Sequence, residues 1–155
     1  MSAPTGSAAT GSMVVRRARP GDALSLKRLV RELGYDPSDP RASDETIAQV
    51  VRHPEAAVFV AVDGIEVIGY VAVSHRPQMR LGGRLASIDE LVVTAGRRST
   101  GLGTRLVEAA IAHARSLHCK RIEVHQRRSR ESYARRFYQD RGFVEVDSAV
   151  LRIDL

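Results

Sequence analysis

The chain has 155 residues, of which 43% are hydrophobic and 27% charged, as is typical of one globular domain. No apolar run approaches the roughly 20 residues that a membrane span needs, and the single cysteine, Cys119, excludes an internal disulfide framework and fits a reducing, cytoplasmic location. The net charge of +6 is compatible with anionic partners, but aromatic residues make up only 5% and do not alternate with basic ones, so we expect no nucleic-acid stacking surface.

The first half of the chain alternates short apolar segments with turn residues. Residues 1–12 are rich in Ser, Ala, Gly and Thr and lack the regions of a signal peptide, so we interpret them as a flexible leader or expression remnant. A strand is expected over 13–18, then a helix capped by Asp22 and ended by Gly34. A loop over 35–43 and a second helix over 44–52 follow. Apolar runs at 56–62 and 65–74, joined by Asp63-Gly64, predict a hairpin.

The second half contains one crossover between parallel strands. We expect a loop over 76–84 and then a strand over 85–94. This strand should be buried on both faces, because apolar residues stand at both its odd and its even positions. A helix with 3.6-residue periodicity runs to about His118, and a strand follows over 121–125. A helix over 131–140, ended by Gly142, and a hairpin of 143–146 and 149–153 complete the chain. This order predicts an α/β fold with a mixed sheet, in which an antiparallel meander precedes the crossover.

The segment between the buried strand and the following helix carries the strongest functional signal. It reads Thr-Ala-Gly-Arg-Arg-Ser-Thr-Gly-Leu-Gly-Thr over residues 94–104. Its glycines leave backbone N–H groups uncovered beside the positive end of a helix, and such a nest can bind a pyrophosphate, with Arg97 and Arg98 adding charge. A Gly-x-Gly pair also occurs in ordinary turns. The segment lacks the Gly-Lys-Ser/Thr of a Walker loop and the third glycine of a dinucleotide fingerprint.

Two motifs, in the correct order, resemble the GNAT superfamily of acyl-CoA-dependent N-acetyltransferases. Arg98-x-x-Gly101-x-Gly103 is similar to the family's Gln/Arg-x-x-Gly-x-Gly/Ala signature, and the Ala-x-x-Phe-Tyr-x-x-x-Gly-Phe of residues 134–143 is similar to its C-terminal motif. The resemblance implies an N-acetyltransferase domain over residues 13–155. It also implies a mixed, mostly antiparallel central sheet that is flanked by helices and splayed between its fourth and fifth strands.

The resemblance further implies how the cosubstrate, acetyl-CoA, is bound. Many relatives have an asparagine where this chain has Glu131, so Arg128 or Arg130 would have to replace that contact. No metal is expected, because His113 and His118 do not share a helical face and Cys119 has no partner. Leu91 and Val93 would contact the pantetheine arm, and the pyrophosphate would be bound by Arg98, Ser99, Thr100, Gly101, Leu102, Gly103 and Thr104.

Acetyl transfer to an amine needs a base for the amine proton and an acid for the leaving thiolate. Tyr138 belongs to the Phe-Tyr pair that lies near the thioester sulfur in relatives, so we interpret it as the acid; the alternative is a packing role. Glu90 is the candidate base, with Asp89 or a water relay as alternatives. Asp89 and Glu90 are neighbours in one strand, so their side chains face opposite sides of the sheet and only one of them can face the acceptor, unless a bulge intervenes. Some relatives carry the glutamate where this chain has Ser87, and a salt bridge to Arg84 would give Glu90 a structural role only.

Three functions are compatible with these residues. The first is acetylation of a primary amine on a small molecule, such as an aminoglycoside-like acceptor. The second is acetylation of a protein N-terminus or lysine, and the third is a non-catalytic CoA-binding regulatory or nucleic-acid-associated domain. Tyr138 and the acidic pair favour the two enzymes. Acceptor specificity would lie in loops expected at 34–44, at 76–84 and around Asp147. Neither nucleic acid nor membrane is expected as a partner, and a homodimer remains open.

Overall fold

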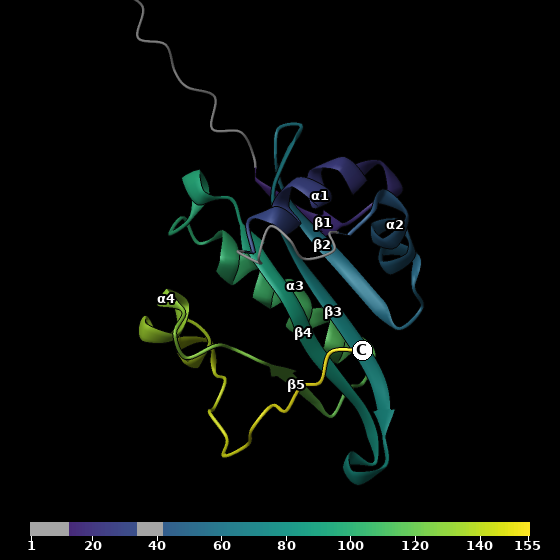
Figure 1. Ribbon diagram of the computed structural model, residues 1–155, viewed down its shortest axis with the longest axis vertical. Coiled ribbons are helices and arrows are strands. Elements are labelled where there is room, and N and C mark those ends of the chain that lie inside the picture. The colour runs from purple at the N-terminus through teal and green to yellow at the C-terminus, as the bar shows by residue number, and fades with distance from the viewer. Residues whose placement is uncertain (1–12, 34–41) are drawn as a thin grey trace, which may run out of the picture.

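The computed structural model describes residues 13–33 and 42–155, which fold around a five-stranded sheet with helices on both faces (Figure 1). The expected leader, Gly34 as a helix end and most of the loop at 35–43 lie outside the described residues. The elements are β1 (Val14–Arg17), α1 (Ala23–Arg31), α2 (Asp44–Arg52), β2 (Ala56–Asp63), β3 (Glu66–Gln78), β4 (Gly83–Val93), α3 (Leu102–Ser116), β5 (Arg121–Val124) and α4 (Glu131–Ala134).

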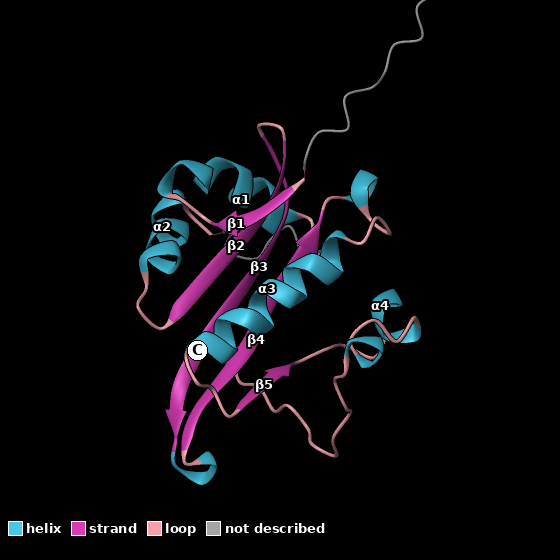
Figure 2. Ribbon diagram, turned by 180° about the vertical axis from the view of Figure 1, so that it is seen from behind, coloured by secondary structure: helices cyan, strands magenta, loops and turns pink. Residues whose placement is uncertain are grey.

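The strands lie in the order β1-β2-β3-β4-β5. Those from β1 to β4 form an antiparallel meander, whereas β5 is parallel to β4 and is reached through α3. Figure 2 shows α3 across one face of the sheet, with α1 and α2 on the opposite face. The expected α/β fold with a mixed, mostly antiparallel sheet is therefore confirmed.

Alternate residues of β3 pack into two apolar layers. Val71 lies in the cluster that contains Leu106 of α3, whereas Tyr70 lies in the cluster that contains Leu29 of α1. Burial of a leucine side chain contributes about 1.5–3 kcal/mol to stability, so the fully buried Leu29 and Leu106 help to hold a helix on each face. Because both faces are covered, β3 is a nearly continuous apolar run rather than an alternating one.

The start of α1 is fixed by an ion pair rather than by the expected helix cap. Asp22 occupies the N-cap position, but its side chain makes no capping bond to the helix. Its carboxylate accepts hydrogen bonds from Arg16 at 2.8 and 2.9 Å and from the Arg19 N–H at 2.7 Å. The hydrogen-bonded Arg16 holds the pKa of Asp22 below its usual value. Asp22 thus joins β1 to the beginning of α1.

The expected loop over 76–84 is wrong, because β3 and β4 continue to pair almost to the turn. Pro77 lies opposite Arg84, and Gln78 lies opposite Gly83. Proline is tolerated there because β2 pairs with β3 only as far as Ser74, so Pro77 has no ladder partner on that side. The hairpin at Asp63-Gly64 formed as expected, between β2 and β3.

The sheet opens between β4 and β5. These strands pair only from Leu85 opposite Arg121 to Ile88 opposite Val124, whereas β4 continues to Val93. Residues 89–93 therefore have no described strand partner on the β5 side. This is the splay that the resemblance implied.

Two expectations for the C-terminal segment are wrong. The helix expected over 131–140 stops at Ala134, where a turn with Arg136 at φ 54° leads into a 3-10 turn at Gln139–Arg141. The hairpin expected at 143–146 and 149–153 is absent from the described structure, and Val144 and Leu151 are exposed. Alternating apolar residues predict a strand only where a neighbouring backbone supplies hydrogen bonds, and the segment pairs with no described strand.

Candidate functional site

A cavity of about 450 Å³ lies beside the end of β4, where the sheet is splayed. Its walls come from four parts of the chain: the end of α1, the last residues of β4, the turn with the start of α3, and the segment around α4. Figure 2 shows α4 next to the N-terminal end of α3. The lining residues are Glu32, Leu33, Leu91, Val92, Val93, Arg97, Arg98, Ser99, Gly101, Gly103, Thr104, Arg130, Glu131, Ser132, Arg135, Phe137, Tyr138 and Arg141.

Most of the residues expected to bind the cosubstrate line this cavity. Two of them, Thr100 and Leu102, do not. The Thr100 hydroxyl donates to the Arg97 carbonyl at 2.6 Å, and the Leu102 side chain is buried in the core. Their expected contribution is through the backbone N–H, which does not depend on where the side chain lies.

The turn before α3 presents a run of backbone donors. Ser99 has φ 61° and Gly101 has φ 83°, so the chain reverses direction immediately before the helix. In the part of the chain that the structure describes, none of the N–H groups from Ser99 to Thr104 donates a hydrogen bond to another protein group. Helix geometry leaves the N–H groups at the start of α3, from Leu102 to Thr104, without an intrahelical acceptor, and the helix dipole places positive potential there. The arrangement is suited to an anion with several oxygen atoms.

Contacts with other elements hold the turn in place. The Glu32 carboxylate accepts hydrogen bonds from the Thr94 hydroxyl at 2.9 Å and from the Ala95 N–H at 3.1 Å. Arg97 pairs with Asp63 at 2.6 Å, so its charge is already balanced and it is less suited to the phosphate contact that the sequence suggested. The donors are therefore positioned before any ligand arrives.

Several arginines line the cavity, and two of them bond to neutral acceptors instead of carboxylates. Arg98 donates to the Val93 carbonyl at 3.1 Å and Arg130 to the Leu33 carbonyl at 2.6 Å, so both bond to neutral acceptors. Arg135 lies 3.5 Å from Glu131 and 3.4 Å from the Ser99 hydroxyl. Of the two arginines considered as substitutes for the family's asparagine, Arg130 lines the cavity, whereas Arg128 does not line it.

Arg141 is a cavity residue that the sequence did not reveal. Its guanidinium donates to the Thr104 hydroxyl at 3.0 Å and lies 3.8 Å from the centre of the Phe137 ring. It also donates to the Phe137 carbonyl. In the sequence Arg141 is one of many arginines, and only its contact with α3 distinguishes it from the others.

Gly103 permits α3 to approach the segment that carries the aromatic pair. A side-chain carbon at this position would lie 3.1 Å from Cζ of Phe137, which is closer than ordinary packing allows. A larger residue would push Phe137, and with it Tyr138, away from the helix.

Tyr138 is a buried phenol at the wall of the cavity. Its relative exposure is 8%, and its ring packs edge-on against Phe137 at 4.9 Å and Phe143 at 5.5 Å. Burial raises the pKa of Tyr138 to about 12, although the positive charge of Arg141 acts in the opposite direction. The described residues supply no hydrogen-bond partner for its hydroxyl. Tyr138 is therefore a protonated donor at neutral pH with its hydroxyl unused.

Glu90 does not line this cavity, because a bulge in β4 turns it to the other face of the sheet. Ala72 pairs with Glu90 and the next residue, Val73, pairs with Ile88, so Asp89 has no opposite residue. Asp89 is exposed, whereas Glu90 is partly buried and accepts a hydrogen bond from the Tyr70 hydroxyl at 2.7 Å.

The salt bridge considered between Glu90 and Arg84 does not form. Arg84 instead donates to Nδ1 of His75 at 2.9 Å. Among residues 13–33 and 42–155, no basic side chain pairs with Glu90. Within these ranges its charge is therefore not balanced by a neighbouring cation.

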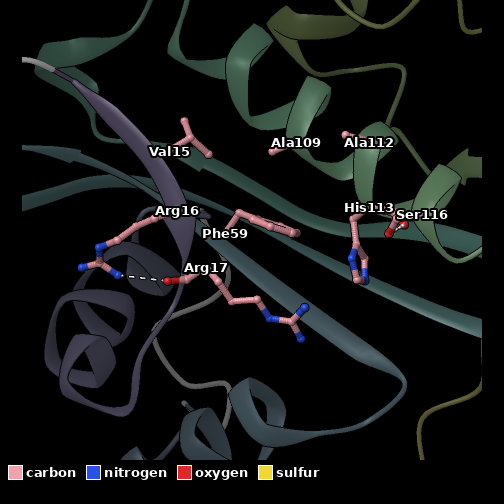
Figure 3. A pocket seen from close by; sticks show the side chains of 8 residues that line it. All are labelled: Val15, Arg16, Arg17, Phe59, Ala109, Ala112, His113 and Ser116. Carbon is pink, nitrogen blue, oxygen red and sulfur yellow. Dashed lines mark hydrogen bonds between the residues drawn. The ribbon is translucent and has the colours of Figure 1, made fainter.

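A second hollow, of about 530 Å³, lies between α3 and the first two strands (Figure 3). The two arginines that line it have local partners, whereas the buried Nε2 of His113 has no hydrogen-bond partner among the described residues. The Arg16 side chain reaches Asp22, and Arg17 donates to the Ala56 carbonyl at 3.1 Å. His113 packs edge-on against Phe59 at 5.5 Å, and burial lowers the pKa of this histidine. None of the residues expected from the sequence lies here; the lining consists of Val15, Arg16, Arg17, Phe59, Ala109, Ala112, His113 and Ser116.

Two further properties of the described residues bear on ligand class. They contain no cluster of His, Cys, Asp and Glu that could hold a metal ion. They also contain no helix that is both long enough and apolar enough to cross a membrane. Burial raises the pKa of the Cys119 thiol, so this lone cysteine is not an activated nucleophile.

Solved structures of similar fold include several acetyltransferases. An acetyltransferase from Trypanosoma brucei has 23% identity and a TM-score of 0.76, over 93% of this chain and 100% of that one. An aminoglycoside acetyltransferase from an uncultured soil metagenomic sample has 19% identity and a TM-score of 0.81, over 92% and 96%. Glucosamine-6-phosphate N-acetyltransferase from Arabidopsis thaliana has 18% identity and a TM-score of 0.76, over 92% and 98%.

Sequence comparisons give the family directly. A search of the curated proteins finds no match. The model of the acetyltransferase (GNAT) family matches residues 24–143, which include the splayed strand, the turn before α3 and the Phe137-Tyr138 pair. The chain therefore belongs to the GNAT acetyltransferase family.

Proposed function

We propose that this protein is a cytoplasmic enzyme that transfers the acetyl group of acetyl-CoA to the primary amine of a small molecule. The observation that carries the proposal is the run of unpaired backbone N–H groups from Ser99 to Thr104 beside Arg98. A pyrophosphate offers several oxygen acceptors and negative charge, which this arrangement matches. The amides of residues 98–104 would bind the pyrophosphate, and Arg130 and Arg141 would add positive charge around it.

The splay in the sheet supplies the path for the pantetheine arm. Residues 89–93 have no β5 partner, so their backbone groups on that side are open to an amide-containing chain. Leu91 and Val93 line the cavity at this edge and would provide apolar contact. The residues present therefore fit acetyl-CoA from the pyrophosphate to the thioester end, where Tyr138 lies.

The chemistry divides between the two faces of β4. Acetyl-CoA supplies the acetyl group and a thiolate as leaving group. Glu90, directly or through a water molecule, takes the proton of the bound ammonium, and the freed amine nitrogen forms the new C–N bond as the C–S bond breaks. The nitrogen gives up its second proton to solvent, which leaves the amide. Tyr138 donates its hydroxyl proton to the departing sulfur and regains a proton from solvent. Both substrates are held together, so no covalent enzyme intermediate is needed.

The charge of Glu90 favours a cationic acceptor. A partly buried carboxylate without a basic partner is stabilised by a cation that binds beside it. Both an aminoglycoside acetyltransferase and a ribosomal-protein-alanine N-acetyltransferase have a similar fold, so the preference for a small polycationic amine over a protein N-terminus or a lysine side chain rests on Glu90 and not on the fold. A non-catalytic CoA-binding domain would need neither an unused Tyr138 hydroxyl nor an unbalanced Glu90.

Thiol release from acetyl-CoA, measured with a panel of amines, tests this function. The panel should include polyamines, aminoglycosides, amino acids and peptides with a free N-terminus or lysine. We expect release with a small amine and the acetylated amine by mass spectrometry. Release with peptides alone would favour the protein acetyltransferase, and acetyl-CoA binding without release in any mixture would favour the regulatory domain. A gel-shift experiment with DNA at roughly physiological salt is the control. If the protein retards the DNA and acetyl-CoA does not compete for binding, the basic residues are not a phosphate site for CoA.

The Glu90→Gln variant tests the base. We expect lower turnover at neutral pH by roughly 10²–10⁴-fold. Higher pH should partly restore it, because more of the amine then arrives deprotonated. The measurement is turnover against pH for wild type and variant with the same amine. A defect without rescue at high pH would assign Glu90 to acceptor binding or support instead of proton transfer.

A further inference from the structure

The hydrogen bond between Tyr70 and Glu90 is an unusual feature of this sheet. Tyr70 lies on β3 and is 2% exposed, so its ring is fixed in the core beneath α1. Its hydroxyl donates to one carboxylate oxygen, Oε2 of Glu90, at 2.7 Å. A charge-assisted bond of this length is strong, and it restrains the carboxylate from one side.

The bulge in β4 is what brings the two groups together. In a regular strand Glu90 would share a face with Ile88, which is buried on the α3 side. Asp89 is the additional residue, and after it Glu90 pairs with Ala72 on the face that carries Tyr70. Tyr70 pairs with Val92, so it lies diagonally across from Glu90, within reach of a long side chain.

We propose that Tyr70 is the positioning residue for Glu90 as proton acceptor. This inference rests on the role proposed above for Glu90. Tyr70 holds Oε2, which leaves Oε1 to accept the proton of the acceptor ammonium. Asp89, next in the chain, is exposed, Arg84 is bonded to His75, and no described basic side chain pairs with Glu90. The phenol is therefore the described group that orients this carboxylate.

The direct test is Tyr70→Phe, which removes the hydroxyl and retains the buried ring. Loss of one hydrogen bond to a charged group corresponds to about tenfold in an equilibrium or rate, so we expect kcat to fall by about tenfold. The fall should appear in the kcat–pH profile and not in the KM of the amine, because the carboxylate keeps its charge and loses only the bond that orients it. The acetyl-CoA Kd, measured by calorimetry, should not change. Two amines of different basicity should show the same fall, since its cause lies in the enzyme.

Tyr133→Phe is the matched control. The Tyr133 hydroxyl donates to Glu145 at 2.9 Å, so this variant also removes a tyrosine–glutamate bond, but outside the cavity. It should retain the wild-type profile. In the Glu90→Gln background, Tyr70→Phe should cause little further loss of kcat, because a residue that acts through Glu90 has no effect without it.

Each result separates this inference from the proposed function. A wild-type kcat and profile in Tyr70→Phe, with Glu90→Gln impaired, would overturn the inference and leave the function intact. Wild-type activity in Glu90→Gln would overturn both the base and its positioning residue, and absence of thiol release by the wild type would overturn the function itself.

If Tyr70→Phe does not fold, the Glu90→Asp variant tests the inference instead. It keeps the charge but withdraws it from Tyr70, so it should show the same fall in kcat with an unchanged KM for the amine, and a wild-type kcat would contradict the inference.

Discussion

At the scale of single residues, the environment of Tyr138 suits a proton donor better than a packing residue. Phe137 and Phe143 enclose the ring edge-on, and burial raises the pKa to about 12. A phenol with this pKa stays protonated throughout the range in which the enzyme would work. The described residues leave its hydroxyl without a partner, although a buried phenol normally finds one. A ligand sulfur at the wall of the cavity would provide that partner.

Tyr138→Phe should therefore lower kcat without weakening acetyl-CoA binding. The ring and its two aromatic contacts are retained, and only the proton donor is lost. General acid assistance is worth roughly 10²–10⁴-fold, and we expect a loss within that range. Steady-state turnover and calorimetry of acetyl-CoA binding provide the measurement. A variant that turns over like the wild type would show that the thiolate leaves without protonation by Tyr138.

At the scale of elements, the geometry at the N-terminus of α3 is suited to an anion. The turn places Gly101 at φ 83°, a conformation that side chains with a Cβ adopt only with strain. Glu32 holds the beginning of the turn, and Thr100 bonds to Arg97 within it. The donors are thus oriented by contacts that do not involve a ligand.

Gly101→Val should disturb this orientation. A β-branched residue at positive φ costs about 1–3 kcal/mol, and the turn can relieve the strain only by rotating its N–H groups away. Since each charge-assisted bond is worth roughly 1.5–3 kcal/mol, acetyl-CoA should bind at least about tenfold more weakly. Circular dichroism and calorimetry test fold and affinity separately.

Gly96→Ala is the matched control for this change. Gly96 lies in the same turn, has no positive φ, and has no atom within 4 Å of the position that a side-chain carbon would take. Its affinity for acetyl-CoA should equal that of the wild type. Equal affinity in a folded Gly101→Val would exclude the nest as the pyrophosphate site.

At the scale of the whole molecule, the sheet separates the groups that would act on the two substrates. Leu91 and Val93 pack with the α3 layer, as does Tyr138, whereas Glu90 faces the α1 layer with Tyr70. The edge of β4 over residues 89–93, which β5 does not cover, is where the two layers are accessible to each other. Under the proposed function, the splay would let an acceptor held on one face of the sheet meet an acetyl group held on the other.

The raised pKa of Tyr138 also predicts how the stability of the molecule depends on pH. The unfolded chain releases the phenol proton near pH 10.0, but the folded protein only near pH 12, so the free energy of unfolding falls as the pH rises through this interval. The contribution is at most roughly 2–3 kcal/mol. Tyr138→Phe should lose less stability than the wild type between neutral pH and about pH 11. The measurement is urea denaturation of the wild type and the variant at neutral pH and at about pH 11. An equal loss of unfolding free energy in both proteins would show that Tyr138 titrates normally.

The sequence by itself determined the features that depend on local patterns. Apolar periodicity placed the elements from β1 to β5, and Asp63-Gly64 placed a hairpin, since turn chemistry and side-chain period act over a few residues. The spacing of Arg98, Gly101 and Gly103 indicated the nest before α3 for the same reason, because a strand, a glycine turn and a helix follow one another in the chain. The motif around Tyr138 identified the family that the comparisons confirm.

Only the tertiary structure decided what depends on register and on contacts between distant segments. The bulge at Asp89, which turns Glu90 toward Tyr70, exists only when β3 and β4 pair, and no local pattern records it. The hydrogen bond from Arg141 to Thr104 exists only because the fold brings the C-terminal segment against α3. The C-terminal apolar alternation favoured a hairpin that did not form. A strand needs hydrogen bonds from a neighbouring backbone, and whether such a neighbour is present is a property of the fold rather than of the segment.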